Sequence, residues 1–118
     1  MVHSYPELNE QVRKLMEKYG KESPKVMQAF VQLHESSFAD GALSAKIKEL
    51  IALAIGISVR CDGCISYHVH DALEAGASRE EIVETIGVAI LMGGGPAVVY
   101  GSQALKALNE FEEKGLNT

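Results

Sequence analysis

The apolar run over residues 50–57 limits the possible folds of this chain more than any other stretch. An apolar run alone fits either a buried strand or a buried helix. Here the helical pattern starts earlier, at Ala45 and Ile47, with Lys46 and Lys48 between them. We therefore predict a helix capped by Ser44 that runs to about residue 59. Because its apolar part has no polar side, we expect this helix to be buried all round.

Apolar residues recur at helical spacing along nearly the whole chain, and no stretch shows the apolar–polar alternation of a half-buried strand. Glycines, prolines and capping residues divide the pattern into segments. The signals are a stop at Gly20, a start at Ser23-Pro24, a break at Asp40-Gly41, a helix from about Cys61 to Gly76, a capping box from Ser78 to Glu81, and a turn at Gly93–Gly95 before Pro96. The sequence predicts an all-α fold, with one domain of about six helices over residues 1–118.

Length and charge narrow the class of protein. A chain of 118 residues is long enough for one hydrophobic core. The net charge of -5 and the scattered basic residues argue against a nucleic-acid partner. The N-terminus lacks the pattern of a signal peptide, and no apolar run is long enough to span a bilayer. We expect a soluble, cytoplasmic protein without a membrane partner, in which two nearby cysteines are more often catalytic or metal-binding than structural.

The two cysteines and a histidine share one face of the predicted fourth helix. At about 100° per residue, Cys61, Cys64 and His68 line up, whereas His70 lies about 200° from His68 and is expected to face water. The helix N-terminus favours thiolate over thiol, and a histidine one turn from Cys64 can take its proton. This set suits two-electron reduction of a peroxide or thiol–disulfide exchange, so a peroxidase and a disulfide oxidoreductase both stay open. The first cysteine of such pairs often attacks, but the histidine favours Cys64, so the order stays open.

A carboxylate precedes the apolar run. Glu49 has apolar helical neighbours, and buried carboxylates are rare unless another group pairs with them or uses them. The alternative is a carboxylate near the start of a helix, with its head in solvent and stabilised by the helix dipole. Spacing alone does not separate the two interpretations.

Together, Glu49, the apolar helix and Cys61-x-x-Cys64-x-x-x-His68 resemble the signature of the AhpD-like alkyl hydroperoxidase and carboxymuconolactone decarboxylase superfamily. The resemblance extends over residues 43–108. It implies an AhpD-like helical domain that assembles into homotrimers or homohexamers. The third and fifth helices cannot both be central in so short a chain, which also suggests a partner copy.

The resemblance further implies a peroxiredoxin-type antioxidant oxidoreductase that reduces hydroperoxides. Cys64 would attack the peroxide, Cys61 would form a disulfide with it, and His68 and Glu49 would relay protons. An external dithiol reductant would reset the pair, and we expect no cofactor or metal. Gly63 departs from the pattern, because the founding peroxidases have a histidine there. Those enzymes are also longer.

Three other functions compete with a peroxidase. A decarboxylase-like enzyme acting on a small lactone would share the fold, but that branch typically lacks the cysteine pair. A zinc site would need a fourth ligand such as His70. In a non-catalytic assembly module the cysteines would be buried apolar residues. Two further residues carry expectations: His34 as a hydrogen-bonded histidine in the core or at its boundary, and Asp71 as a solvated or surface-paired carboxylate rather than a partner of His68.

Overall fold

The computed structural model describes residues 1–116, which form six α-helices and no strand. The all-α prediction is confirmed. The helices are α1 (Tyr5–Glu22), α2 (Pro24–Phe38), α3 (Ala45–Ser58), α4 (Asp62–Glu74), α5 (Arg79–Gly93) and α6 (Gly95–Glu113). None of these helices is both long and apolar enough to cross a membrane.

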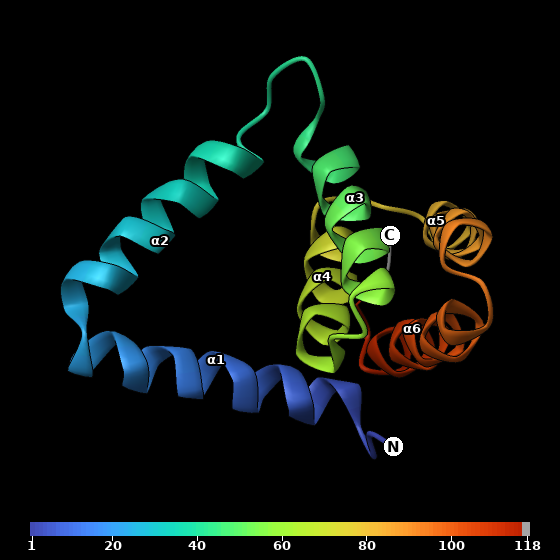
Figure 1. Ribbon diagram of the computed structural model, residues 1–118, viewed down its shortest axis with the longest axis horizontal. Coiled ribbons are helices and arrows are strands. Elements are labelled where there is room, and N and C mark those ends of the chain that lie inside the picture. Colours follow the sequence, from blue (N-terminus) through green and yellow to red (C-terminus); the bar gives the residue numbers. More distant parts are fainter. Residues whose placement is uncertain (117–118) are drawn as a thin grey trace.

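Helices α3 to α6 form the body of the molecule (Figure 1). α3 packs along α4, and α5 and α6 close the other side. Aliphatic side chains from all four helices fill the core, because burying their apolar surface is the main favourable term in folding. The largest fully buried apolar side chains of the body are Leu53, Ile57, Ile65, Val69, Ile82 and Leu108.

Helices α1 and α2 form an arm that leaves this body (Figure 1). The start of α1 is anchored by Tyr5, which is fully buried and donates its hydroxyl to Gln103 at 3.0 Å. Burial, together with the nearby carboxylate of Asp62, raises the pKa of Tyr5 and keeps its hydroxyl protonated. In contrast, α2 contains no buried residue. The start of α1 is therefore anchored in the core, whereas α2 returns toward α3 without entering the core (Figure 1).

Capping residues set most helix starts as predicted. Ser44 caps α3, and Ser78 and Glu81 form the complete capping box of α5. The predicted stop at Gly20 is wrong, because α1 continues to Glu22. The helix ends where Pro24 disfavours helical geometry at the residue before it.

The expectation that α3 is buried all round is also wrong. One face, including Leu53, Gly56 and Ile57, is buried against the body. The opposite face is an exposed apolar stripe, because residues four apart lie on one side of a helix. This α3 stripe consists of Ile47, Ile51, Ile55 and Val59, which are 38%, 45%, 57% and 63% exposed.

Candidate active site

The two cysteines lie at the start of α4, as predicted, and are joined by a disulfide. Cys61 is the N-cap residue, and its sulfur accepts the backbone N–H of Cys64 at 3.1 Å. Once the disulfide is reduced, the same N–H and the helix dipole would stabilise a negative charge on Cys61. The chain reaches this position through a tight link from α3, in which Arg60 adopts a left-handed backbone conformation with φ of 59°.

A glycine in α3 lets the cysteine pair approach closely. A Cβ atom at Gly56 would lie 3.1 Å from the Cβ atom of Cys64, closer than most such contacts. The carbonyl of Gly56 also accepts the backbone N–H of Cys61 at 3.0 Å. Gly56 therefore fixes the first turn of α4 against α3 by both shape and hydrogen bonding.

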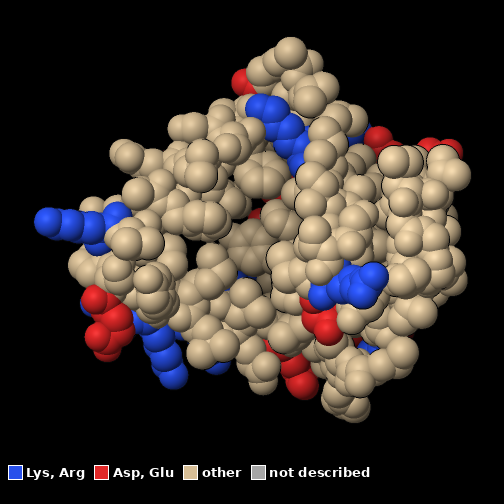
Figure 2. Space-filling model, viewed as in Figure 1, with Lys and Arg blue, Asp and Glu red and all other residues tan. Residues whose placement is uncertain are grey.

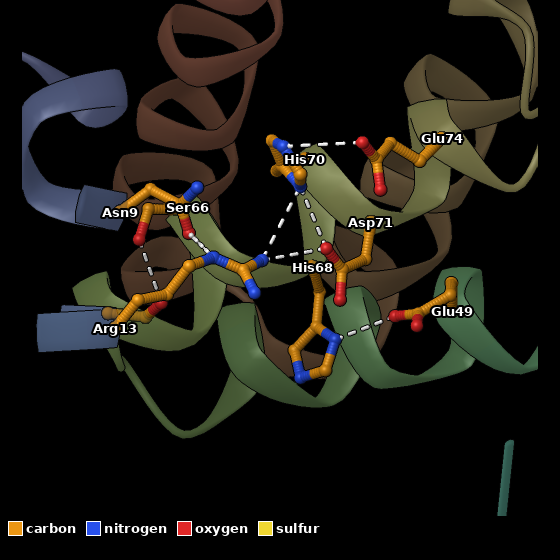
Figure 3. A network of polar contacts seen from close by, with 9 residues as sticks. Asn9, Arg13, Glu49, Ser66, His68, His70, Asp71 and Glu74 are labelled. Carbon is orange, nitrogen blue, oxygen red and sulfur yellow. Dashed lines mark hydrogen bonds and ion pairs between the residues drawn. The ribbon is translucent and has the colours of Figure 1, made fainter. Parts of the chain in front are cut away.

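Glu49 of α3 is buried and paired with His68 of α4 (Figure 3). Its Oε1 lies 2.8 Å from Nδ1 of His68, and the residue is only 6% exposed. Of the two interpretations of this carboxylate, the solvated one is wrong. A carboxylate bound to Nδ1 orients the ring and leaves Nε2 as the basic nitrogen of the neutral imidazole.

A pocket of about 250 Å³ lies over the cysteine pair, between α4 and the α1–α2 arm. Figure 2 shows the surface hollowed between the arm and the body. The pocket wall is mainly apolar, which suits a ligand with a small organic body. The lining residues are Val12 and Met16 from α1, Phe30 and His34 from α2, and Cys61, Gly63, Cys64, Tyr67 and His68 at the start of α4.

The expectation of a hydrogen-bonded His34 is wrong. Its Nε2 is buried and has no hydrogen-bond partner among the described residues. Its ring lies 4.6 Å from that of Phe38 and 6.2 Å, edge to face, from that of Tyr67. Two aromatic rings therefore flank His34, and neither residue pairs with the buried nitrogen.

His70 points away from the cysteines, as predicted, but only part of its side chain reaches water. Its side chain is 22% exposed and packs edge to face on Phe111. Nδ1 of His70 and Nη2 of Arg13 each lie 2.8 Å from Oδ1 of Asp71 (Figure 3). Asp71 therefore joins α1 to α4 and does not contact His68 through a hydrogen bond. These contacts hold the root of the arm to the body.

Sequence reasoning missed the aromatic groups around His68. Phe38 stacks on His68 at 5.9 Å, and Tyr67 meets it edge to face at 5.3 Å. The guanidinium of Arg13 lies 4.0 Å from the centre of the Tyr67 ring. Tyr67 could have been found, because it is three residues after Cys64 on the same helix. Phe38 and Arg13 could not, since their positions depend on how the arm folds back.

The fold and the site together define an all-helical protein with a CxxC disulfide beside a buried Glu–His pair. The sequence pattern of the carboxymuconolactone decarboxylase family matches residues 24–107, which include Glu49, Cys61, Cys64 and His68. The chain therefore belongs to this family, and the resemblance to its superfamily is confirmed.

Solved structures agree with this assignment. A carboxymuconolactone decarboxylase family protein from Legionella pneumophila is 39% identical, with a TM-score of 0.88 over 91% of this chain and 96% of that one. A Thermotoga maritima family member described as possibly involved in an antioxidative response is 33% identical, with a TM-score of 0.79 over 91% of both chains. An uncharacterised protein from Cupriavidus necator is 41% identical over 73% of this chain and 76% of its own length.

Proposed function

We propose that this protein is a thiol-dependent peroxidase that reduces organic hydroperoxides through Cys61 and Cys64. The observation that carries the proposal is a disulfide at a helix start that opens into an apolar pocket, next to His68 paired with buried Glu49. The antioxidative role suggested for the Thermotoga maritima relative supports the same kind of chemistry.

In the first step, His68 takes the proton of the Cys64 thiol, and the thiolate attacks the terminal oxygen of the hydroperoxide. An S–O bond forms and the O–O bond breaks. Cys64 becomes a sulfenic acid, and the peroxide, reduced by two electrons, leaves as an alcohol after gaining one proton. Glu49 holds the imidazole in place and stabilises its charged form.

In the second step, Cys61 displaces water from the sulfenic acid and the disulfide forms. An external dithiol then attacks the sulfur of Cys64 and releases Cys61 as a thiolate, before thiol exchange completes the reset. Cys61 suits this role because the N–H of Cys64 stabilises its negative charge, and a stabilised thiolate leaves faster. The cycle fits the cytoplasm, where such dithiol systems operate.

The test is a reductant-coupled assay with cumene hydroperoxide on wild type, Cys64→Ser and Cys61→Ser. We expect Cys64→Ser to abolish turnover. Cys61→Ser should consume one equivalent of peroxide and stop as a sulfenic acid, which dimedone labels. Ser36→Ala on exposed α2 is the control for an ordinary serine position. If both cysteine variants turn over at the wild-type rate, the proposal is wrong.

The competing functions have weaker support. Lactone decarboxylation is the alternative that the family name suggests, but that reaction gives no role to the disulfide. A zinc site at the cysteines would need both sulfurs free. Within residues 1–116 the group that could surround an ion consists of His70, Asp71 and Glu74, without either cysteine. Asp71 in this group is already paired with Arg13, and Glu74 is exposed.

We also propose that copies of the chain associate, as a trimer or hexamer, through surfaces that include the α3 stripe. Large apolar side chains of α5 are exposed as well, with Leu91 80% and Met92 78% exposed. Contiguous apolar surface of this kind marks protein–protein contacts more often than it remains in water. The partner that we propose is a second copy of the chain, because apolar faces on a small domain are most simply covered by symmetry.

A further inference from the structure

His34 lines the pocket over the cysteine pair, and its Nε2 is buried without a hydrogen-bond partner. No other residue that lines this pocket has a buried, unpaired side-chain N or O atom within residues 1–116. Leaving a buried donor or acceptor without a partner costs about 1–3 kcal/mol. Such an atom in a pocket calls for a functional explanation. His34 belongs to α2, a helix with no buried residue, so packing of the core does not require a histidine at this position.

From this we infer that His34 contacts the bound hydroperoxide and donates the proton that its leaving oxygen takes up. The inference rests on the proposed peroxidase function and adds a catalytic residue to it. The other residues that line the pocket from the arm, Val12, Met16 and Phe30, have no group that can transfer a proton.

The direction of the reaction places the leaving oxygen near the arm. A thiolate displaces at oxygen in line, so the sulfur, the attacked oxygen and the leaving oxygen lie on one axis. Cys64 and His68 both belong to α4 and form one wall of the pocket. The leaving oxygen therefore points away from α4, toward the facing wall, where α2 presents His34. His68 lies on the same wall of the pocket as Cys64.

The proton balance is complete with two histidines. His68 accepts the thiol proton, the Sγ–O bond forms and the O–O bond breaks. The leaving alkoxide takes the proton of a His34 ring N–H and departs as an alcohol. His34 then regains a proton from water, and His68 returns its own to solvent. Sulfur is oxidised and the peroxide reduced by the same two electrons.

The experiment compares two oxidants on reduced wild type and His34→Phe in single turnover. Cumene hydroperoxide leaves as an alkoxide that needs a proton, whereas perbenzoic acid leaves as a stable carboxylate that does not. We expect His34→Phe to slow the cumene hydroperoxide reaction by about a hundredfold or more, as for a lost general acid. The perbenzoic acid rate should stay within about twofold, because this residue gives that reaction no proton.

His3→Phe, in the exposed N-terminal segment, is the matched control and should behave as wild type with both oxidants. If His34→Phe fails to fold, His34→Gln serves instead, because its amide has the same polarity but cannot donate a proton to an alkoxide. Equal rate losses with both oxidants, or no loss with either, would overturn the inference. A wild-type protein that reacts with perbenzoic acid but not with cumene hydroperoxide, or with neither, would overturn the proposed function itself.

Discussion

The carboxylate of Glu49 holds the ring of His68 in place. It is buried, comes from a different helix, and bonds Nδ1 at 2.8 Å. Without it the imidazole could rotate or change tautomer, and its charged form would lose its partner. The orientation of the His68 ring is therefore set by a residue that lies 19 positions earlier in the chain, on α3, rather than by α4 alone.

Replacing this carboxylate gives the first prediction. Glu49→Gln should slow single-turnover oxidation of the thiols by cumene hydroperoxide by about a hundredfold, at the low end of what a positioned proton-transfer system contributes. Glutamine fills the same space, so the circular dichroism spectrum should not change. Glu84→Gln, at an exposed position of α5, is the control. A wild-type rate for Glu49→Gln would remove the carboxylate from the mechanism.

The second prediction concerns Gly56. Gly56→Val should destabilise the fold by about 1–3 kcal/mol, because its side chain would push against Cys64 in a packed interface. Urea denaturation measures the loss. Gly41→Val is the matched control, since a Cβ at Gly41 meets nothing within 4 Å. Equal stability of both variants would show that α3 and α4 tolerate a wider separation.

Helical geometry predicted which histidine lies with the cysteines, but it could not predict what surrounds each one. A turn of about 100° per residue separates His68 from His70 without any knowledge of the fold. The burial of His70 depends on Phe111 of α6, and the open nitrogen of His34 depends on the path of α2. Such contacts join distant parts of the chain, and periodicity carries no information about them.

At the level of helices, starts were easier to predict than stops. The capping box of Ser78 and Glu81 is a local signal, because both partners lie within one turn. Gly20 was misleading, since a glycine inside a helix costs only about 1 kcal/mol and tertiary contacts can offset that. The sequence did not predict that α1 and α2 form an arm, because nothing in the spacing of their residues indicates that both helices extend from the body.

The third prediction concerns the link between α3 and α5. Glu81 accepts the backbone N–H of Ser78 and pairs with Lys46 at 2.9 Å, and these contacts lower its pKa from 4.5. A lowered pKa means that the stabilisation is present above pH 4.5 and is lost as pH falls through the value in the folded protein. The stability difference between wild type and Glu81→Gln should therefore shrink below pH 4.5.

Thermal unfolding of both proteins at several pH values measures this difference. Glu80→Gln, which alters an exposed neighbour in the same turn, controls for the loss of one charge. A difference that stays constant between pH 6 and pH 3 would contradict the prediction, because a neutralised Glu81 can no longer attract Lys46.

For the molecule as a whole, the fourth prediction is that the α3 stripe is covered in solution by another copy. Wild type should run as a trimer or hexamer in size-exclusion chromatography with light scattering. Ile55→Asp should shift it to smaller species, because a carboxylate in an apolar interface loses its hydration. Gln11→Asp adds the same charge at an exposed position of α1. A monomeric wild type would contradict the proposal.

The overall fold class followed from the sequence because helical periodicity is a local property. The arrangement that makes the site does not follow from periodicity. The pocket exists because the chain turns at Ser23, between α1 and α2, so that Phe30 and His34 of α2 lie over the start of α4. The exposed stripe is a second case, because an apolar face looks the same in sequence whether a core or a partner covers it.

The proposal that Cys61 and Cys64 together reduce a hydroperoxide is tested most directly by the stoichiometry of one turnover. Fully reduced wild-type protein is mixed with one equivalent of cumene hydroperoxide, and free thiols, the alcohol product and the Cys61–Cys64 peptide are quantified together. We predict that two thiols disappear for each cumyl alcohol formed, and that both are recovered in the Cys61–Cys64 disulfide. Two free thiols and unreacted hydroperoxide at the end of the reaction would contradict the account.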